Sequence, residues 1–166
     1  MGRGLIEIRK PFEREAEAVN SLIESVFKEC VAPDYSEEGI RFFLKLCNAE
    51  EVRIKTVENC PIIVASENDV VVGVLWTRDI NHISRYFVDV KHQRKGIGRQ
   101  LFNHLLEGIK TEHPEIKDIT VNSSPFACKA YESLGFKRTD HEQNGNGMKY
   151  IPMVYNLERH KMCNPA

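Results

Sequence analysis

The sequence predicts a mixed α/β fold of the α+β type, in which a central, mostly antiparallel sheet of six to seven strands is flanked by about four helices. Apolar, β-branched runs separated by short turns indicate strands, and apolar residues that recur every three or four positions indicate amphipathic helices. Along the chain these elements follow the order β-α-α-β-β-β-α-β-α-β-β. Hairpins produce antiparallel strand pairs and helical crossovers produce parallel ones, so we expect a sheet of mixed direction with helices on both faces.

Capping and turn residues mark the ends of these elements. Ser36 and Ser124 are the expected N-caps of two helices, Pro33 ends the first helix, and Gly135 closes the last one. The expected helices cover residues 11–27, a segment from 36 onward, 97–113 and 124–135. The expected strands cover residues 5–9, 61–65, 70–76, 83–90, 116–121, 136–139 and 150–157, with a connector at 49–59 and a flexible link at 144–147.

The composition indicates one soluble domain over residues 1–166. Its 42% apolar and 28% charged residues are ordinary for a globular protein with a full-sized core. A formal net charge of −1 argues against a general nucleic-acid binder. The five cysteines are widely spaced, form no CxxC pair and are expected to be reduced thiols rather than metal ligands. Nothing resembles a signal peptide or a membrane-spanning run, so we expect a cytoplasmic protein with no metal and no nucleic-acid or membrane partner.

The most informative segment is residues 88–98, where a β-branched strand runs through a basic, glycine-containing loop into a helix. Backbone N–H groups at a helix N-terminus converge on one point and favour an anion there. Gly96 and Gly98 lack the Cβ atoms that would keep a phosphate from the main chain, and Arg94 and Lys95 add positive charge. Leu101 stands at the third glycine position of a GxGxxG motif and no GxxxxGK[ST] sequence is present, which excludes the dinucleotide-binding motif and the P-loop.

The spacing Gln-x-x-Gly-x-Gly at residues 93–98 resembles the acyl-CoA pyrophosphate loop of the GCN5-related N-acetyltransferase (GNAT) superfamily. Further along, residues 121–136 resemble the segment of that superfamily in which a strand is followed by a helix ending in Tyr-Glu-x-Leu-Gly-Phe. With the matching strand order, the chain is identified as a single-domain member of bacterial type, most firmly over residues 83–136. This resemblance implies an N-acetyltransferase that moves an acetyl group from acetyl-CoA to a primary amine by direct attack.

The resemblance also implies a role for each matching residue. The backbone of Val88 and Val90 would contact the pantetheine arm and the acetyl carbonyl. Tyr131 would protonate the departing thiolate, because an unperturbed pKa of about 10 keeps a tyrosine protonated at pH 7. Ser124 holds a place where the family often has asparagine, and Asn122 is a substitute contact to the cofactor arm. The pyrophosphate would be bound by the loop residues Gln93, Arg94, Lys95, Gly96, Ile97 and Gly98.

The general base of this reaction is expected to be His82. It falls where some members of the superfamily carry a catalytic carboxylate, and an imidazole with an unperturbed pKa of about 6.5 suits the task. The alternative interpretation of His82 is a solvated histidine at a strand end, and Asp89 and Glu38 are further candidates for the base. His92 lies in the loop, where it could contact a phosphate.

The acceptor pocket implied by the resemblance lies between the first two helices and the last strand pair, and its acceptor is a small-molecule or peptide amine. Two alternatives from other classes are a non-catalytic acyl-CoA-binding or sensor module and a protein-interaction domain without a cofactor. An exposed final strand would also allow a homodimer. The expected lining of the pocket is Tyr35, Glu37, Glu38, Phe42, Trp76 and residues 140–149.

Overall fold

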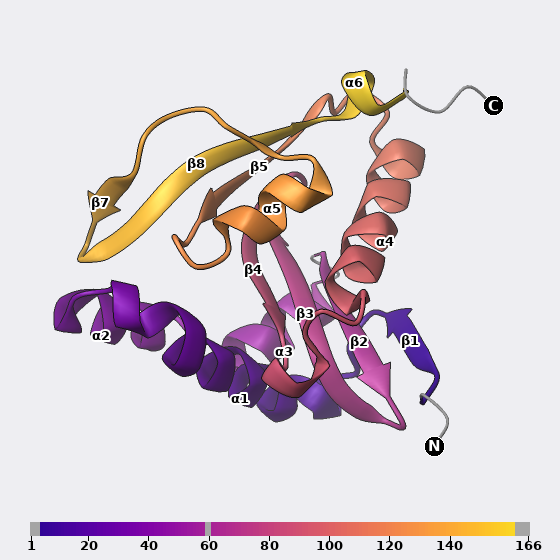
Figure 1. The fold of residues 1–166 in the computed structure, drawn as a ribbon. Coiled ribbons are helices and arrows are strands. Elements are labelled where there is room, and N and C mark those ends of the chain that lie inside the picture. Colours follow the sequence, from indigo (N-terminus) through magenta and orange to yellow (C-terminus); the bar gives the residue numbers. More distant parts are fainter. Residues whose placement is uncertain (1–3, 59–60, 162–166) are drawn as a thin grey trace.

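An open sheet forms the centre of the protein, with the strand order β1-β2-β3-β4-β5-β8-β6 and with β7 paired to β8 (Figure 1). The computed structural model describes residues 4–58 and 61–161. Every strand pair in this part of the chain is antiparallel except β4 with β5, which is parallel. The strands are β1 (Ile6–Arg9), β2 (Ile62–Glu67), β3 (Val70–Arg78), β4 (His82–Val88), β5 (Asp118–Ser123), β6 (Lys137–Arg138), β7 (Gln143–Gly145) and β8 (Met148–Asn156).

Helices cover both faces of this sheet, as Figure 1 shows. Helix α4 packs against β1 to β4 on one face, and α1 packs against β3 and β4 on the other. None of the helices in the described segments is long and apolar enough to cross a membrane. The helices are α1 (Ala16–Val26), α2 (Glu37–Lys45), α3 (Ala49–Val57), α4 (Ile97–Glu112), α5 (Cys128–Leu134) and α6 (Leu157–Lys161).

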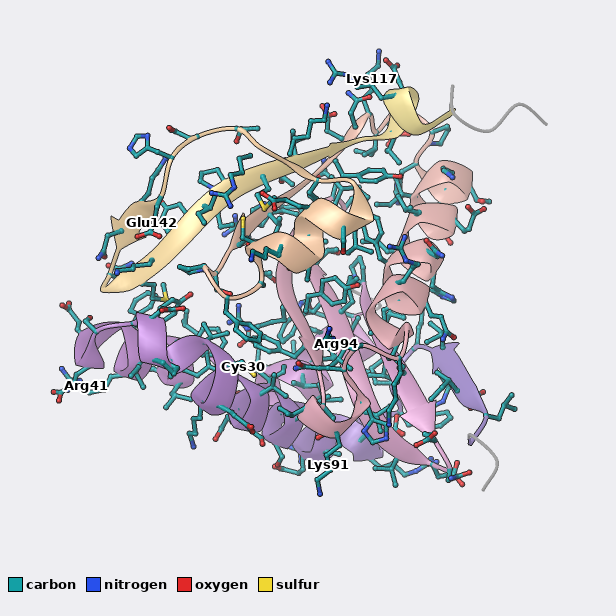
Figure 2. The ribbon with its side chains drawn as sticks, in the orientation of Figure 1. Cys30, Arg41, Lys91, Arg94, Lys117 and Glu142 are labelled. Carbon is teal, nitrogen blue, oxygen red and sulfur yellow. The ribbon has the colours of Figure 1, made fainter. Side chains whose placement is uncertain are left out.

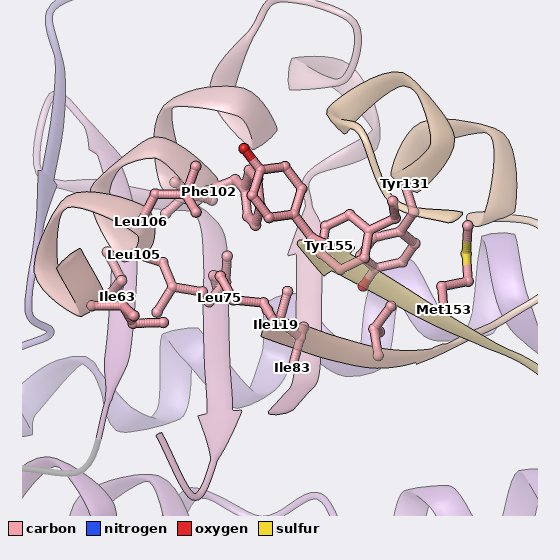
Figure 3. Close-up of a cluster of buried hydrophobic side chains, with 14 of the residues drawn as sticks. Ile63, Leu75, Ile83, Phe102, Leu105, Leu106, Ile119, Tyr131, Met153 and Tyr155 are labelled. Atoms are coloured by element: carbon pink, nitrogen blue, oxygen red, sulfur yellow. The ribbon is translucent and has the colours of Figure 1, made fainter. Parts of the chain in front are cut away.

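Two hydrophobic cores result, one on each face of the sheet. The core beneath α4 and α5 is rich in aromatic side chains, and Figure 3 shows Phe102, Tyr155 and Met153 in it beside Tyr131. The rings of Phe102 and Tyr155 meet edge to face with centroids 5.1 Å apart. In the other core, α1 to α3 pack on the sheet, and the rings of Phe27 and Phe43 stack at 3.8 Å.

The mixed α/β fold class is therefore confirmed, and so are several predicted element ends. Ser36 caps α2, because its Oγ accepts a hydrogen bond from the Gly39 N–H at 3.2 Å. Gly135 ends α5 with φ 108°, a backbone conformation that favours glycine. Pro33 lies in a short 3-10 turn, η3 (Ala32–Asp34), after α1 has continued into one π-helical turn, η2 (Phe27–Val31).

Two predicted connectors are wrong, because both hold regular structure. Residues 49–57 form α3, whose N-cap Asn48 accepts a hydrogen bond from the Glu51 N–H at 2.8 Å. Residues 144–147 are not a flexible link, since β7 and β8 form a hairpin across Asn146 and Gly147. Both turn residues have positive φ, 53° and 76°, as a type I′ turn requires.

Three further expectations need correction. Val90 does not extend the strand, because β4 ends at Val88 and Asp89 is the N-cap of the 3-10 turn η4 (Val90–His92). Ser124 does not cap a helix, because its Oγ accepts from the Ala127 N–H within a turn and α5 begins only at Cys128. The final strand β8 is not an exposed edge, since it lies between β5 and β6.

Of the five cysteines, Cys60 and Cys163 lie outside the described residues, and the other three are free thiols.

The N-terminus of α2 contacts the turn of the β7–β8 hairpin. The Ser36 N–H and the Ser36 hydroxyl both donate to the Gly147 carbonyl, at 3.1 and 3.2 Å. A Cβ atom at Gly39 would lie 2.2 Å from the same carbonyl oxygen, so only glycine permits this approach. We call this contact the α2–hairpin contact.

Candidate active site

A cleft opens where β4 and β5 separate. Within the described chain the two strands pair only at His82–Thr120 and Ile83–Val121. Beyond these pairs, β4 remains paired with β3 and β5 remains paired with β8, so the two strands separate. The resulting cleft of about 810 Å³ is bounded by η2, α2, β4, the loop after β4, the start of α4, β5 and α5. Figure 2 labels Cys30 from η2 and Arg94 from the loop, which both line it.

The loop between β4 and α4 is held by its own polar groups. The Asp89 N–H donates to the Val72 carbonyl on β3 at 2.9 Å, and the Asp89 carboxylate accepts from the Lys91 N–H at 3.2 Å. The Gln93 side chain donates to the Val88 carbonyl at 3.0 Å. Arg94 and Gly96 have φ of 61° and 84°, so the backbone is left-handed at two positions before α4 begins.

The peptide groups of Val88 point into the gap between β4 and β5. Residues of an antiparallel pair alternate in the side to which their N–H and C=O groups point, and Asp89 is bonded to β3. Val88 therefore faces away from β3. Because the Gln93 side chain binds the Val88 carbonyl, the loop and the strand end are connected at this point of the cleft.

The N-terminus of α4 lies at the same end of the cleft. The first N–H groups of a helix have no intrahelical acceptor, and the helix dipole adds a partial positive charge. Gly98 also packs closely on β4, because a Cβ atom there would lie 3.2 Å from the Tyr86 hydroxyl. That hydroxyl donates to the Gly98 carbonyl, which ties β4 to the first turn of α4.

Tyr131 reaches the cleft from α5 through the core. Its side chain is 6% exposed and lines the cleft, and its ring meets Tyr86 edge to face at 5.7 Å. Burial raises the pKa of Tyr131 well above its usual value, and the neighbouring Tyr86 adds to this effect. Within residues 4–58 and 61–161 the Tyr131 hydroxyl makes no hydrogen bond, so a protonated, unpartnered donor lies at the cleft.

Most of the residues predicted from the sequence meet at this cleft. The residues that line it are Val88, Gln93, Arg94, Gly96, Gly98, Asn122, Ser124 and Tyr131. Four others do not line it: Val90, Lys95, Ile97 and His82. The Ile97 side chain is 2% exposed and packs in the core under α4, so only the backbone of this residue can contribute to the anion site at the helix end.

His82 lies where β4 and β5 are still paired, opposite Thr120. One ring nitrogen, Nδ1, is 2.8 Å from the Thr120 Oγ1. Burial lowers the pKa of His82, and the positive charge of Arg78 lowers it further. The imidazole is therefore neutral at pH 7, and its role as the base stays a prediction.

Aromatic side chains form the wall of the cleft opposite α5. Tyr35 lines it as expected, but Phe43 lines it in place of the expected Phe42, which is 37% exposed. Trp76 is buried in the core under α1 rather than in the cleft lining. The sequence interpretation also missed Tyr86, although a tyrosine two residues before the strand end faces the same side as Val88.

No group of three or more histidine, cysteine or acidic side chains that could hold a metal ion is present among the described residues. The site thus consists of an anion-attracting helix end, a strand edge with inward-pointing peptide groups and a buried tyrosine. A helix end of this kind beside two separating strands can hold an anionic ligand in the cleft.

Comparison with known proteins identifies the family. The sequence pattern of the acetyltransferase (GNAT) domain matches residues 31–157. This protein therefore belongs to the GNAT acetyltransferase family and is an acyltransferase. Among curated proteins, none matches the chain.

Solved structures show the same fold at low sequence identity. A GCN5-related N-acetyltransferase from Rhodopseudomonas palustris matches with a TM-score of 0.78 and 18% identity, over 95% of this chain and 99% of its own. The PaiA N-acetyltransferase from Thermoplasma acidophilum, solved with coenzyme A, matches with a TM-score of 0.75 and 19% identity, over 92% and 99%. An aminoglycoside 6′-acetyltransferase of type Ii matches with a TM-score of 0.66 and 18% identity, over 90% and 96%.

Proposed function

We propose that this acetyltransferase moves the acetyl group of acetyl-CoA to a primary amine, with Tyr131 as the general acid. The observation that carries the proposal is the Tyr131 hydroxyl, a donor without a partner in the described chain that lines the cleft beyond the α4 helix end. The structural neighbour solved with coenzyme A supports the donor, and the neighbours described as N-acetyltransferases support an amine as the acceptor.

The donor is bound by the loop and the helix end. The backbone N–H groups of residues 94–98 would hold the pyrophosphate, and Arg94, which lines the cleft, would add a formal positive charge beside it. The gap between β4 and β5, toward which Val88 directs its N–H, would hold the pantetheine arm. Asn122 and Ser124 line the same gap from the β5 side.

The residues of the chain act on the charges that develop during transfer. The inward-pointing Val88 N–H stabilises negative charge on the thioester oxygen as the amine attacks. As the amine nitrogen bonds to the acetyl carbon and the C–S bond breaks, the Tyr131 hydroxyl donates its proton to the leaving sulfur, which departs as the thiol of coenzyme A. The proton that the amine loses passes to solvent, and solvent returns a proton to Tyr131. Because burial raises the pKa of Tyr131, the residue stays protonated over the whole working pH range. We assign no side chain as the base that takes a proton from the amine, since His82 does not line the cleft.

The test compares two tyrosine-to-phenylalanine variants by steady-state kinetics. Tyr131→Phe should lower kcat at least tenfold and leave the KM for acetyl-CoA within about twofold, because it removes only a donor used in the transition state. Tyr150→Phe is the matched control. It removes a hydroxyl that donates to the Gln143 side chain at 3.0 Å in the β7–β8 hairpin, so kcat should change less than twofold. An unaltered kcat in Tyr131→Phe would exclude the general-acid assignment.

A further inference from the structure

Two carboxylates from separate parts of the fold face one histidine of the donor loop. His92 Nδ1 lies 2.6 Å from a carboxylate oxygen of Asp89, which begins the loop. His92 Nε2 lies 3.0 Å from a carboxylate oxygen of Glu67, at the end of β2. The three side chains are 21%, 35% and 25% exposed in the order His92, Asp89 and Glu67, so water reaches all of them only in part.

This geometry requires a charged imidazole. A neutral imidazole has one N–H donor and one bare nitrogen, whereas an ionised carboxylate only accepts hydrogen bonds. Both carboxylates therefore accept a hydrogen bond from His92 only when the ring carries two protons. The hydrogen bond to Asp89 has the largest effect on the pKa of His92 and raises it, burial lowers it, and the hydrogen bond to Glu67 raises it further, so that the net shift is upward.

With both ring nitrogens engaged, His92 has no N–H left for a phosphate. Its contribution is to the shape and charge of the loop instead. The Asp89 end of the loop is bonded to β3 through the main chain, and His92 adds a connection from the loop to Glu67 on β2. His92 also lines the cleft on the side of Arg94 and Gly96, close to where an anion would bind.

We propose that His92 is a positioning residue for the donor: as an imidazolium it fixes the loop against Glu67 and cancels one of two negative charges beside the pyrophosphate site. The inference rests on the proposed donor, acetyl-CoA. Loss of the His92 proton breaks one carboxylate contact and lowers the charge of the loop by one. Glu67 and Asp89 are the described titratable groups that face the ring. The loop cations Lys91, Arg94 and Lys95 do not contact it.

The expected consequence is a donor affinity that depends on pH. A histidine whose pKa is raised in the folded protein keeps its contacts at low pH and loses them as the pH rises through that pKa. The affinity for acetyl-CoA should therefore fall on going from pH 7 to pH 9. Acetyl-CoA has no free thiol, and a phosphate monoester is already doubly ionised above a pKa of about 6, so the ligand's charge does not change in this interval.

The experiment is direct titration of acetyl-CoA by calorimetry at pH 7 and pH 9, which needs no acceptor. Wild type should bind at least fivefold more weakly at pH 9 than at pH 7. His92→Gln should bind weakly at both values, whereas His92→Lys, with a permanent charge, should lose less than twofold between them. His104→Gln, which changes an exposed histidine of α4, is the control and should behave as wild type. Thermal unfolding of each variant establishes that it is folded.

Two results would overturn the inference. The first is a wild-type affinity that is equal at both pH values, and the second is a His92→Gln protein that matches wild type at each. A glutamine variant that is folded and unchanged would show that the charge plays no part. Failure of the proposed function has a different signature, because wild type and the His104→Gln control would then not bind acetyl-CoA at either pH.

Discussion

The α2–hairpin contact allows one stability prediction to be worked out from the structure. In Gly39→Ala, the new Cβ atom would lie 2.2 Å from the Gly147 carbonyl oxygen and 2.5 Å from its carbon. Both are backbone atoms, so no side chain can rotate away and the hairpin has to move. The two hydrogen bonds from Ser36 to that carbonyl are then lost.

The magnitude follows from three contributions. Two lost hydrogen bonds cost about 2 kcal/mol, and overpacking adds about 1–3 kcal/mol. Alanine in place of glycine in a helix returns at most about 1 kcal/mol. We therefore expect the free energy of unfolding to fall by about 3 kcal/mol. For a chain of this length, that corresponds to a melting temperature about 6–12 °C lower.

The assay is thermal unfolding followed by circular dichroism, with Gly108→Ala as the matched control. Gly108 lies inside α4, and a Cβ atom there meets nothing within 4 Å. The control should be as stable as wild type or up to about 1 kcal/mol more stable, because alanine has the higher helix propensity. If Gly39→Ala were stabilised as much as Gly108→Ala, the close approach of α2 and the hairpin would be refuted.

Three further predictions concern the cleft. Gly96→Ala places a side chain at φ 84°, so we expect about 1–2 kcal/mol of strain in the loop. The KM for acetyl-CoA should then be at least fivefold higher in steady-state assays, and an unchanged KM would contradict the role of this turn. His82→Gln should leave kcat/KM within about threefold, since the ring binds Thr120 rather than the cleft, and a loss of tenfold or more would support His82 as the base. The raised pKa of Tyr131 predicts that kcat does not fall between pH 8 and pH 10. A kcat that falls with rising pH below pH 10 in wild type, but not in Tyr131→Phe, would show instead that Tyr131 ionises in this interval.

The parts of the fold with strong periodicity could be predicted from the sequence. Helix α4 and strands β2 and β3 have long apolar patterns, so they were placed within a few residues of their observed ends. Helix α3 was missed because only Ala49 and Val52 of its residues are buried, which leaves little amphipathic pattern. The Asn48-x-x-Glu51 sequence before it is a capping signal that could have revealed it.

The β7–β8 hairpin was missed for a different reason. Asn146 and Gly147 form a dipeptide that strongly favours a two-residue hairpin turn, but together with the neighbouring Asn144 and Gly145 they suggest a flexible link. The position of Gly147 against α2 depends on a contact across 111 residues of sequence, which no local pattern encodes.

In the site, the loop and Tyr131 could be predicted because their motifs are local. The partners of His92 could not, since Glu67 reaches it from another hairpin and the pairing depends on the sheet. Tyr86 was missed because a tyrosine in a strand resembles any other core residue until α4 is placed beside it. The sequence thus predicts a donor site, and the structure adds the contacts that hold the loop in place.

The most direct test of the account measures thiol release from acetyl-CoA across a panel of primary amines, from polyamines and aminoglycosides to amino acids and lysine peptides. The account predicts that at least one amine gives acetyl-CoA-dependent thiol release clearly above the background without amine. Thiol release that no amine raises above background, from a protein that acetyl-CoA nevertheless stabilises against heat, would contradict it and would indicate a binding module that does not transfer the acetyl group.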